Sequence, residues 1–304
     1  MMSSKTLLYI SGPTGIGKTK LSISLAKSFD TEIISCDSRQ FYKEMKIGTA
    51  VPNQNELAEV KHNFIQHKSI HDTYTVGEFE KDVLVKLKEL YKSKNIIIMV
   101  GGSGMYADAV MFGLDKFPKV LNKVRSQINL FYQTHGLYSL QQLVLEKDPK
   151  LYSRVDINNP MRLIRALEVC ISTEKPYSSF LGKKLINRSF ISKTIILNCS
   201  RTMLYDRINN RVDSMVESGL ELEAKKLMKH KDLPSLKTVG YKELFPYFEG
   251  KISLERAISE IKKNTRRYAK RQITWLKKYL SLIHISEPTR PERIGDGVVG
   301  VEKK

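Results

Sequence analysis

The sequence predicts an α/β protein with a P-loop-type parallel sheet covered by helices and an all-helical insertion. Three observations support this fold class. A glycine-rich turn joins an apolar run to an amphipathic stretch at residues 7–29, further strand-like runs alternate with helical patterns, and strand signals vanish between residues 116 and 193. Alternating strands and helices are typical of a parallel sheet whose faces are covered by helices.

The first strand, turn and helix lie at residues 7–29. Residues 7–10 (LLYI) suit a buried strand, and Leu21, Leu25 and Phe29 recur at helical spacing. The turn between them reads GPTGIGKT and fits the pattern G-x-x-x-x-G-K-[ST] in the strand-to-helix setting that it requires. The residues that we predict to bind a di- or triphosphate are Gly12, Pro13, Thr14, Gly15, Ile16, Gly17, Lys18 and Thr19.

The chemistry of this turn suits an anion. Glycines let backbone N–H groups converge on a phosphate, and the positive end of the following helix adds to their field. Lys18 supplies a full charge, and Thr19 supplies a hydroxyl that can bind Mg²⁺. The alternative, a glycine-rich turn without a ligand, is disfavoured by the order of strand, motif and helix.

Two further predicted strands end in polar residues. Residues 32–35 run into Asp37, where open parallel sheets present ligand-binding groups. Asp37 could ligate Mg²⁺, act as a general base or cap a helix. Residues 95–100 run into GGSGMY, which is either a second anion turn in which Ser103 offers a hydroxyl or a tight turn without a ligand. Because no acid follows this strand, a nucleotide hydrolase is disfavoured.

Helical patterns dominate residues 116–193. At residues 159–171, Asn159 can cap a helix, Pro160 fits its first turn, and Arg162 and Arg165 fall away from its apolar face. We therefore predict a core formed by residues 1–115 and 194–279, with a fourth strand at 194–198, and an inserted helical domain at 116–193. The predicted apolar face of the 159–171 helix comprises Leu163, Ala166, Leu167, Cys170 and Ile171.

The composition points to a polyanionic partner. Lysine and arginine outnumber the acidic residues by 51 − 32 = 19, which favours nucleic acid or an anionic membrane surface, with a merely lysine-rich surface as the alternative. The three cysteines are odd in number and lack C-x-x-C spacing, so neither a disulfide framework nor a zinc knuckle is indicated. With no signal-peptide pattern and no run of transmembrane length, we expect a cytoplasmic protein.

The positive charge concentrates at residues 261–279, which hold eight basic residues and no acidic one. A membrane-surface helix is disfavoured here because Thr265 and Gln272 interrupt the apolar face, so we expect this charge to meet phosphates. After Tyr279 the helical pattern stops, and LSLIHISEPTR matches the translation of a common sequencing-library adapter. We therefore predict that residues 280–304 are a non-native tail. The predicted packed face of the basic helix comprises Leu254, Ile258, Ile261, Thr265, Tyr268, Gln272 and Leu276.

Six motifs occur in the order found in bacterial tRNA dimethylallyltransferases. They are GPTGIGKT, DSRQFY at 37–42, GGSGMY at 101–106, NPMRLIRALEV at 159–169, VGYKE at 239–243 and TRRYAKRQITW at 265–275. The sequence thus resembles that family over most of its length up to Tyr279. The resemblance implies transfer of a dimethylallyl group from dimethylallyl diphosphate to N6 of the adenosine immediately 3′ of the tRNA anticodon, with release of diphosphate. In this family the glycine loop holds the diphosphate of the prenyl donor rather than a nucleotide.

The resemblance also implies roles for individual residues. Asp37 would take a proton from N6, while Lys18, Thr19 with Mg²⁺, Ser103 and Arg211 would bind or neutralise the leaving diphosphate. His62 is followed by Asn63 where many members have paired histidines, so neither is given a role. The residues expected to contact tRNA are Asp37, Ser38, Arg39, Gln40, Arg162 and Arg165, which would read bases, and Arg266, Arg267, Lys270 and Arg271, which would hold phosphates.

Two other functions stay open at this point, a small-molecule kinase that uses the same loop for ATP and a non-catalytic tRNA-binding protein. We expect a monomer that acts away from membranes, with tRNA and dimethylallyl diphosphate as partners and Mg²⁺ as cofactor.

Overall fold

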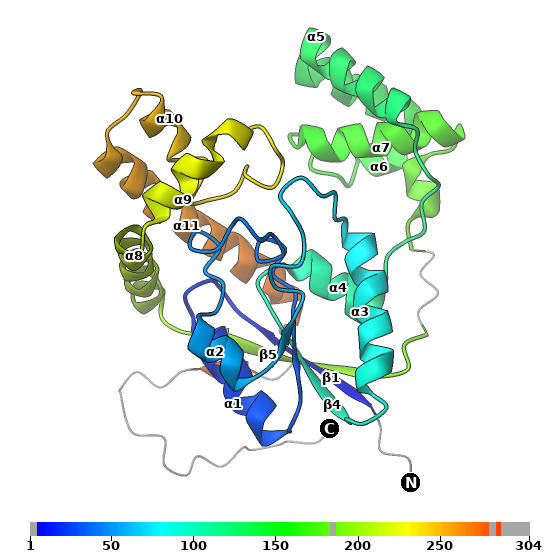
Figure 1. The fold of residues 1–304 in the computed structure, drawn as a ribbon. Helices are drawn as coiled ribbons and strands as arrows, with labels where there is room; N and C mark the ends of the chain where they lie inside the picture. The colour runs from blue at the N-terminus through cyan, green and yellow to red at the C-terminus, as the bar shows by residue number, and fades with distance from the viewer. Residues whose placement is uncertain (1–4, 183–186, 280–283, 287–304) are drawn as a thin grey trace. The chain divides into compact units, whose positions relative to one another are not determined.

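The computed structural model describes residues 5–182, 187–279 and 284–286 (Figure 1). The chain divides into two compact units, one formed by Met1–Met111 with Ser189–Lys304 and the other by Phe112–Arg188. We call the first unit the core and the second the helical unit. The sequence analysis predicted the insertion at residues 116–193, whereas the helical unit of the structure spans residues 112–188.

A six-stranded sheet organises the core, and every pair of neighbouring strands in it is parallel. The strand order is β3-β2-β4-β1-β5-β6, which confirms the predicted parallel α/β architecture. The strands are β1 (Thr6–Ser11), β2 (Ile33–Ser35), β3 (His62–Asn63), β4 (Ile96–Val100), β5 (Ile191–Asn198) and β6 (His284–Ser286).

The four predicted strands correspond to β1, β2, β4 and β5. β5 begins earlier than expected because residues 191–193 already pair with residues 6–8 of β1, although Ser192 and Lys193 give this stretch no apolar signal. β6 lies within the segment 280–304, whose other residues are outside the described part of the chain. The non-native origin of that segment stays a prediction.

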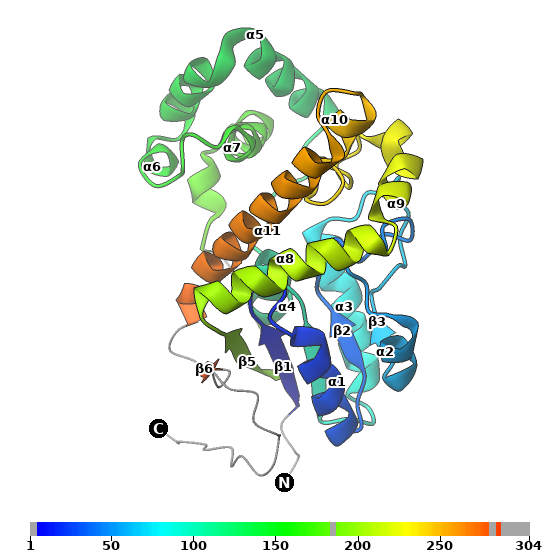
Figure 2. The ribbon, with the colours of Figure 1, turned by 90° about the vertical axis from the view of Figure 1, so that its left-hand side faces the viewer.

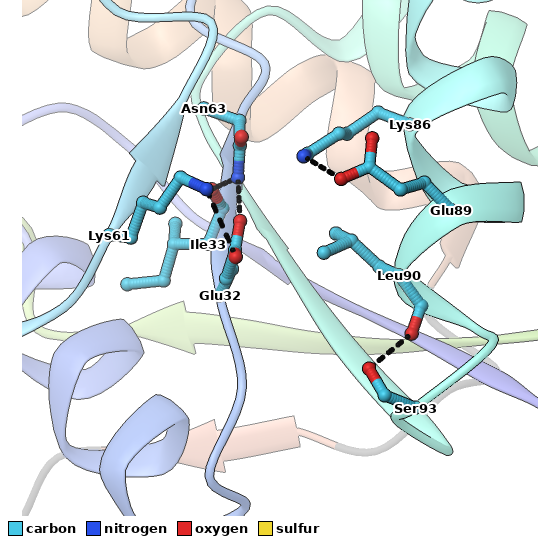
Figure 3. Close-up of polar contacts among 8 residues, drawn as sticks. All are labelled: Glu32, Ile33, Lys61, Asn63, Lys86, Glu89, Leu90 and Ser93. Atoms are coloured by element: carbon cyan, nitrogen blue, oxygen red, sulfur yellow. Dashed lines mark hydrogen bonds and ion pairs between the residues drawn. The ribbon is translucent and has the colours of Figure 1, made fainter.

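β3 has two residues, too few for a periodic signal in the sequence. Side-chain contacts hold it against β2 (Figure 3). Asn63 Nδ2 donates to Glu32 Oε2 at 2.9 Å and to the Ile33 carbonyl at 3.1 Å, and Lys61 Nζ donates to Glu32 Oε1 at 3.2 Å. This pairing fixes where His62 lies relative to the ends of the other strands.

Helices cover both faces of the sheet (Figure 1). On one face Tyr9 packs with Phe79 and Val83 of α3, and on the other Ile10 packs with Ile23 of α1. Burial on both faces is what a parallel sheet requires. The helices of the core are α1 (Lys18–Ser28), α2 (Gln54–Glu59), α3 (Val76–Leu90), α4 (Gly104–Phe112, which reaches the helical unit), α8 (Arg201–Glu217), α9 (Leu220–Leu227), α10 (Phe245–Phe248) and α11 (Leu254–Leu276), with short 3₁₀ turns at Met228–His230 and Lys277–Tyr279.

α8 and α11 lie across the carboxyl ends of β1 and β5 (Figure 2). There Ile16 of the glycine turn packs against Leu204 and Ile208 of α8 and Ala269 of α11. The turn therefore packs against two helices that come much later in the sequence, beginning at Arg201 and Leu254. The strand ends, the glycine turn and these helices form one region of the core.

Two glycines give the turn its backbone path. Gly12 has φ +149°, and a Cβ there would lie 2.8 Å from the carbonyl oxygen of Leu197, so no other residue fits. Gly17 has φ +100° and precedes the first residue of α1, Lys18. The motif thus places Lys18 at the helix N-terminus, as predicted.

Every described element of the helical unit is helical. Within α7, Asn159 caps the first turn by accepting the N–H of Arg162, and Pro160 follows it, as predicted. The predicted apolar face is wrong at Ile171, which is 42% exposed, whereas Ile164 is buried. α7 contacts both α5 and η1, so its buried surface is wider than one stripe. The elements are α5 (Asn122–Lys147), α6 (Pro149–Tyr152), α7 (Pro160–Thr173) and η1 (Tyr177–Phe180).

None of the helices in the described residues combines the length and the apolar character needed to cross a bilayer.

Candidate active site

A cavity of about 430 Å³ lies at the carboxyl ends of the central strands. Its wall includes Lys18 and Thr19 from the start of α1, Asp37 from the turn after β2, and Arg211 from α8. A second cavity of about 240 Å³ shares Asp37 and Arg211 and is also lined by Tyr268 of α11. The fold thus brings together four residues that the sequence analysis singled out, from three separate stretches of the chain.

Lys18 is turned toward its own loop. Its Nζ donates to the carbonyls of Gly12 and Pro13, both at 3.0 Å. The pKa of Lys18 is lowered to about 8, chiefly by burial and also by the charge of Arg211, while the Asp37 carboxylate opposes both effects. An anion in this cavity would relieve the unfavourable environment of the ammonium group.

Asp37 combines a local contact with exposure to the cavity. Its Oδ1 accepts the N–H of Arg39 at 3.1 Å, which is an Asx turn. The helix-capping alternative is wrong, because the next helix after β2 is α2, which begins at Gln54. Within the described residues, Oδ2 has no hydrogen-bond partner. The carboxylate therefore keeps one oxygen for a ligand, a proton or a metal ion.

Arg211 lies in the cavity wall, and burial lowers its pKa, while the carboxylate of Asp37 counteracts that effect. Arg207, one turn earlier on α8, also lines the cavity and donates from Nη1 to the carbonyl of Ile16 at 3.5 Å. α8 therefore supplies two guanidinium groups to a cavity that already holds an ammonium group.

Ser103 joins two turns of the backbone. Its Oγ accepts the N–H of Ser38 at 3.0 Å and lies 3.0 Å from the hydroxyl of Ser38. Ser103 does not line either of the two cavities described above. Direct contact with a diphosphate, which the resemblance implies, stays a prediction.

Arg39 and Gln40 hold the loops around the cavity. Arg39 Nη1 donates to the carbonyl of Ser235 at 3.2 Å. Gln40 Nε2 donates to the carbonyl of Ala50 at 2.9 Å, and its Oε1 accepts from Ser35 Oγ at 3.2 Å. These side chains have structural partners in addition to the tRNA contacts predicted for them.

A carboxylate clamps the neighbouring loop. Glu223 accepts the backbone N–H groups of Lys46, Ile47 and Gly48 at 2.9–3.1 Å, and the hydroxyl of Tyr241 at 2.6 Å. The same loop continues into residues 49 and 50, which line the cavity. The VGYKE motif thus contributes Tyr241 to the support of the cavity wall.

His62 is a cavity residue to which the sequence analysis gave no role. Its Nδ1 lies 2.8 Å from the Val60 carbonyl, and among the described residues its buried Nε2 has no partner. Burial lowers the pKa of this imidazole. Its position depends on the pairing of β3 with β2, for which the sequence carries no signal.

The hydrogen bonds of Gln272 are a second feature that the sequence did not predict. The residue was expected on the packed face of α11, and it is buried there. Its Oε1 accepts the N–H of Thr14 at 2.9 Å, and its Nε2 donates to the carbonyl of Gly102 at 3.0 Å. The one feature of the sequence that could have indicated these contacts is that Gln272 is a polar residue on an otherwise apolar helix face.

α11 buries a narrower face than predicted. Ile261, Gln272 and Leu276 are buried as expected, but Leu254, Ile258, Thr265 and Tyr268 are only half-buried. Ala257 and Ala269 of this helix are fully buried and were not predicted. Alanine has a small side chain and therefore carries a weak apolar signal in the sequence.

The predicted phosphate-binding residues of α11 fall into two groups. Arg267, Lys270 and Arg271 are exposed and line a groove of about 590 Å³ together with Trp275. Arg266 instead donates from Nη1 to Asn209 Oδ1 at 2.7 Å. Three of the four cations are therefore open to a polyanion, and Arg266 has a partner on α8.

In the helical unit, one of the two predicted tRNA-binding arginines is exposed and the other has a partner within the protein. Arg162 is exposed. Arg165 Nη1 donates to Glu168 Oε2 at 3.2 Å, and Arg125 binds the same carboxylate at 2.6 Å and 3.1 Å. Because Glu168 is only 2% exposed, loss of one member of this pairing would be costly for the helical unit.

The glycine turn, Lys18 and Arg211 meet in a cavity at the carboxyl ends of the strands, which defines an α/β protein with a cationic cavity at the edge where parallel sheets bind their ligands. The family model described as IPP transferase matches residues 40–279 of this chain. The chain belongs to the IPP transferase family. This confirms the resemblance seen in the motifs.

Individual relatives agree with this assignment. The chain is 57% identical over 275 residues to a tRNA dimethylallyltransferase of Christiangramia forsetii (90% of this chain, 91% of the relative), and 54% identical over 278 residues to one of Flavobacterium psychrophilum (90% and 91%). Among solved structures, a tRNA isopentenylpyrophosphate transferase of Bacillus halodurans aligns with a TM-score of 0.67 at 36% identity (93% of this chain, 90% of that one). A eukaryotic dimethylallyltransferase crystallised acting on tRNA aligns with a TM-score of 0.80 at 26% identity (93% and 74%).

Proposed function

We propose that the chain transfers the dimethylallyl group of dimethylallyl diphosphate to N6 of the adenosine immediately 3′ of a tRNA anticodon and releases diphosphate. The observation that carries this proposal is the placement of Lys18 and Arg211 in one cavity with the carboxylate of Asp37. The relatives named tRNA dimethylallyltransferase support the same reaction.

The cations would act on the leaving group. When the bond between C1 of the donor and its bridging oxygen breaks, the electron pair stays with the diphosphate. Lys18, the N–H groups of the glycine turn and Arg211 would stabilise that charge as it develops. Electrostatic stabilisation of this kind is most effective in a cavity from which water is largely excluded.

Asp37 would act on the acceptor. As N6 forms its bond to C1, the amine must lose a proton, and Oδ2 of Asp37 would take it. The hydrogen bond from the N–H of Arg39 to Oδ1 holds the carboxyl group in place. The adenine would have to leave its stack to bring N6 to this cavity.

We propose Mg²⁺ as the cofactor, with Thr19 as the protein ligand. The residues present fit this ion, because Thr19 and Asp37 bring oxygen donors to the same cavity, and Mg²⁺ is commonly held by few protein ligands together with substrate phosphates and water. When bound, the ion would neutralise part of the diphosphate charge.

tRNA would lie on the exposed cations of α11. Arg267, Lys270 and Arg271 would contact phosphates and so position the substrate, with Arg162 as a further contact from the helical unit. Ser38, Arg39 and Gln40 adjoin Asp37 and would lie near the target base. We propose that the protein acts as a monomer in the cytoplasm, where tRNA is found.

Mass spectrometry of nucleosides tests the reaction directly. The full chain is incubated with dimethylallyl diphosphate, Mg²⁺ and unmodified tRNA, and the tRNA is then digested. We expect one prenyl group on adenosine with wild-type protein and none with Asp37→Asn. A folded protein that binds tRNA and leaves adenosine unchanged would contradict the proposal.

A thermal-shift measurement separates the proposal from the kinase alternative. At equal concentration, dimethylallyl diphosphate should raise the melting temperature more than ATP, because the ligand that binds the folded state more tightly stabilises it more. The reverse order would favour the kinase.

A further inference from the structure

Gln272 connects the two glycine turns of the core to α11. Its Oε1 accepts the N–H of Thr14 in the turn after β1, and its Nε2 donates to the carbonyl of Gly102 in the turn after β4, at 2.9 Å and 3.0 Å. The side chain is 7% exposed. One buried amide therefore satisfies a donor and an acceptor on two loops that come from neighbouring strands.

The fit at Gly102 is close. A Cβ on Gly102 would lie 2.1 Å from Gln272 Nε2, so residue 102 must be glycine for Gln272 to occupy this place. Glutamate lacks the donor that Gly102 requires, and methionine of similar size lacks both polar groups. Of the side chains with this reach, glutamine alone matches both loops.

We infer that Gln272 is a positioning residue that holds the two glycine turns in the geometry that binds the donor diphosphate. The inference rests on the proposed function in that the diphosphate is taken as the ligand. Gln272 acts through Thr14 and Gly102 rather than by touching the substrate. Because a small displacement of catalytic groups has a large effect on rate, loss of this link should lower donor binding and turnover.

The same geometry predicts that tRNA affinity does not depend on Gln272. The side chain points into the protein, whereas the neighbouring Lys270 and Arg271 are exposed. If Gln272 is a positioning residue, its loss should therefore weaken donor binding and leave tRNA affinity unchanged. General damage to α11 would weaken tRNA binding as well.

The test compares Gln272→Met with Gln141→Met in the full chain. Gln141 belongs to the helical unit and donates from Nε2 to the carbonyl of Ile157 at 3.0 Å, so its substitution also removes an amide hydrogen bond to the backbone. For Gln272→Met we expect kcat/KM for the donor to fall about tenfold to a hundredfold and pyrophosphate to bind more weakly, with the Kd for tRNA within about twofold of wild type. Gln141→Met should leave the donor kinetics and pyrophosphate binding unchanged.

Gly102→Ala disturbs the same hydrogen bond by changing the loop residue, and it leaves the sequence of α11 unchanged. Its methyl group would displace Gln272, so it should reproduce the donor defect. Unchanged donor kinetics in Gln272→Met, or an equal loss of tRNA affinity, would overturn the inference. Should Gln272→Met not fold, Gly102→Ala with wild-type donor kinetics would overturn it as well.

Titration with inorganic pyrophosphate separates this inference from the proposed function. If wild-type protein binds pyrophosphate and Gln272→Met binds it more weakly, the positioning role stands even when no adenosine is prenylated. If wild-type protein prenylates tRNA and the variant does so with equal kinetics, the positioning role fails and the proposed function stands.

Discussion

The described residues that line the core cavity include three cations, Lys18, Arg207 and Arg211, and one carboxylate, that of Asp37. In the helical unit, two arginines, Arg125 and Arg165, share the buried carboxylate of Glu168. In the cavity the cations outnumber the carboxylate by two, whereas in the helical unit both guanidinium groups hydrogen-bond directly to the one carboxylate. An excess of partly buried cations is costly for the fold, and an anionic ligand would offset that cost.

Lys18→Met is the strongest test of this difference. Because Lys18 is expected to act on the developing charge of diphosphate, kcat/KM for the donor should fall about a thousandfold. The melting temperature should stay close to that of wild type, because burial of the ammonium group is unfavourable and offsets its hydrogen bonds to the loop. Steady-state kinetics and thermal unfolding measure the two effects.

The matched control is Lys20→Met, which removes an exposed lysine two residues further along α1. Equal losses of activity in the two variants would show that the position of Lys18 is immaterial.

Glu168→Gln should show the opposite pattern. Loss of the buried carboxylate leaves two arginines with a neutral partner, so the free energy of unfolding should fall by about 1–3 kcal/mol. The cost stays moderate because both guanidinium groups can be hydrated. Chemical denaturation measures the loss, and pyrophosphate binding should not change. A stable variant with weakened pyrophosphate binding would contradict the division between the two units.

The pH dependence of donor binding tests whether the positive charge of Lys18 in the cavity is available to an anion. The pKa of Lys18 is lowered to about 8, so in the absence of ligand the ammonium group loses its proton as the pH rises through this value. A diphosphate favours the protonated form, so its affinity should fall above about pH 8, by up to about tenfold per pH unit. Calorimetric titrations with pyrophosphate from about pH 7.5 to about 9.5 would measure this decline.

Lys18→Arg supplies the control, because a guanidinium group keeps its charge over this range. A decline of the same size in that variant would assign the titration to another group.

The smallest effect is expected on the exposed surface of α11. Lys270→Gln removes one cation proposed to contact phosphate, so the slope of log K against log salt for tRNA should decrease by about one, with little change in stability. Lys88→Gln on α3 removes an exposed lysine remote from this helix and should leave the slope unchanged. Identical slopes in wild type and Lys270→Gln would exclude this contact.

Local signals in the sequence predicted much of the fold. The motif GPTGIGKT predicted the strand, turn and helix around Lys18, because glycine conformation and helix capping depend on adjacent residues. Asn159 and Pro160 likewise predicted the start of α7. The prediction was wrong at Ile171 and missed the first residues of β5, since both depend on which neighbours cover the segment.

The sequence by itself determined the parallel α/β core, the glycine turn with Lys18 and the family, because each rests on residues close together in the chain or on motifs in a fixed order. The tertiary structure alone decided that Gln272 links Thr14 to Gly102, that Glu223 holds the loop at residues 46–48, and that His62 lies in the cavity wall. These contacts join residues about 170 or more positions apart, or depend on a strand of two residues. Their geometry comes from the packing of α9 and α11 and from strand pairing, which no local pattern encodes.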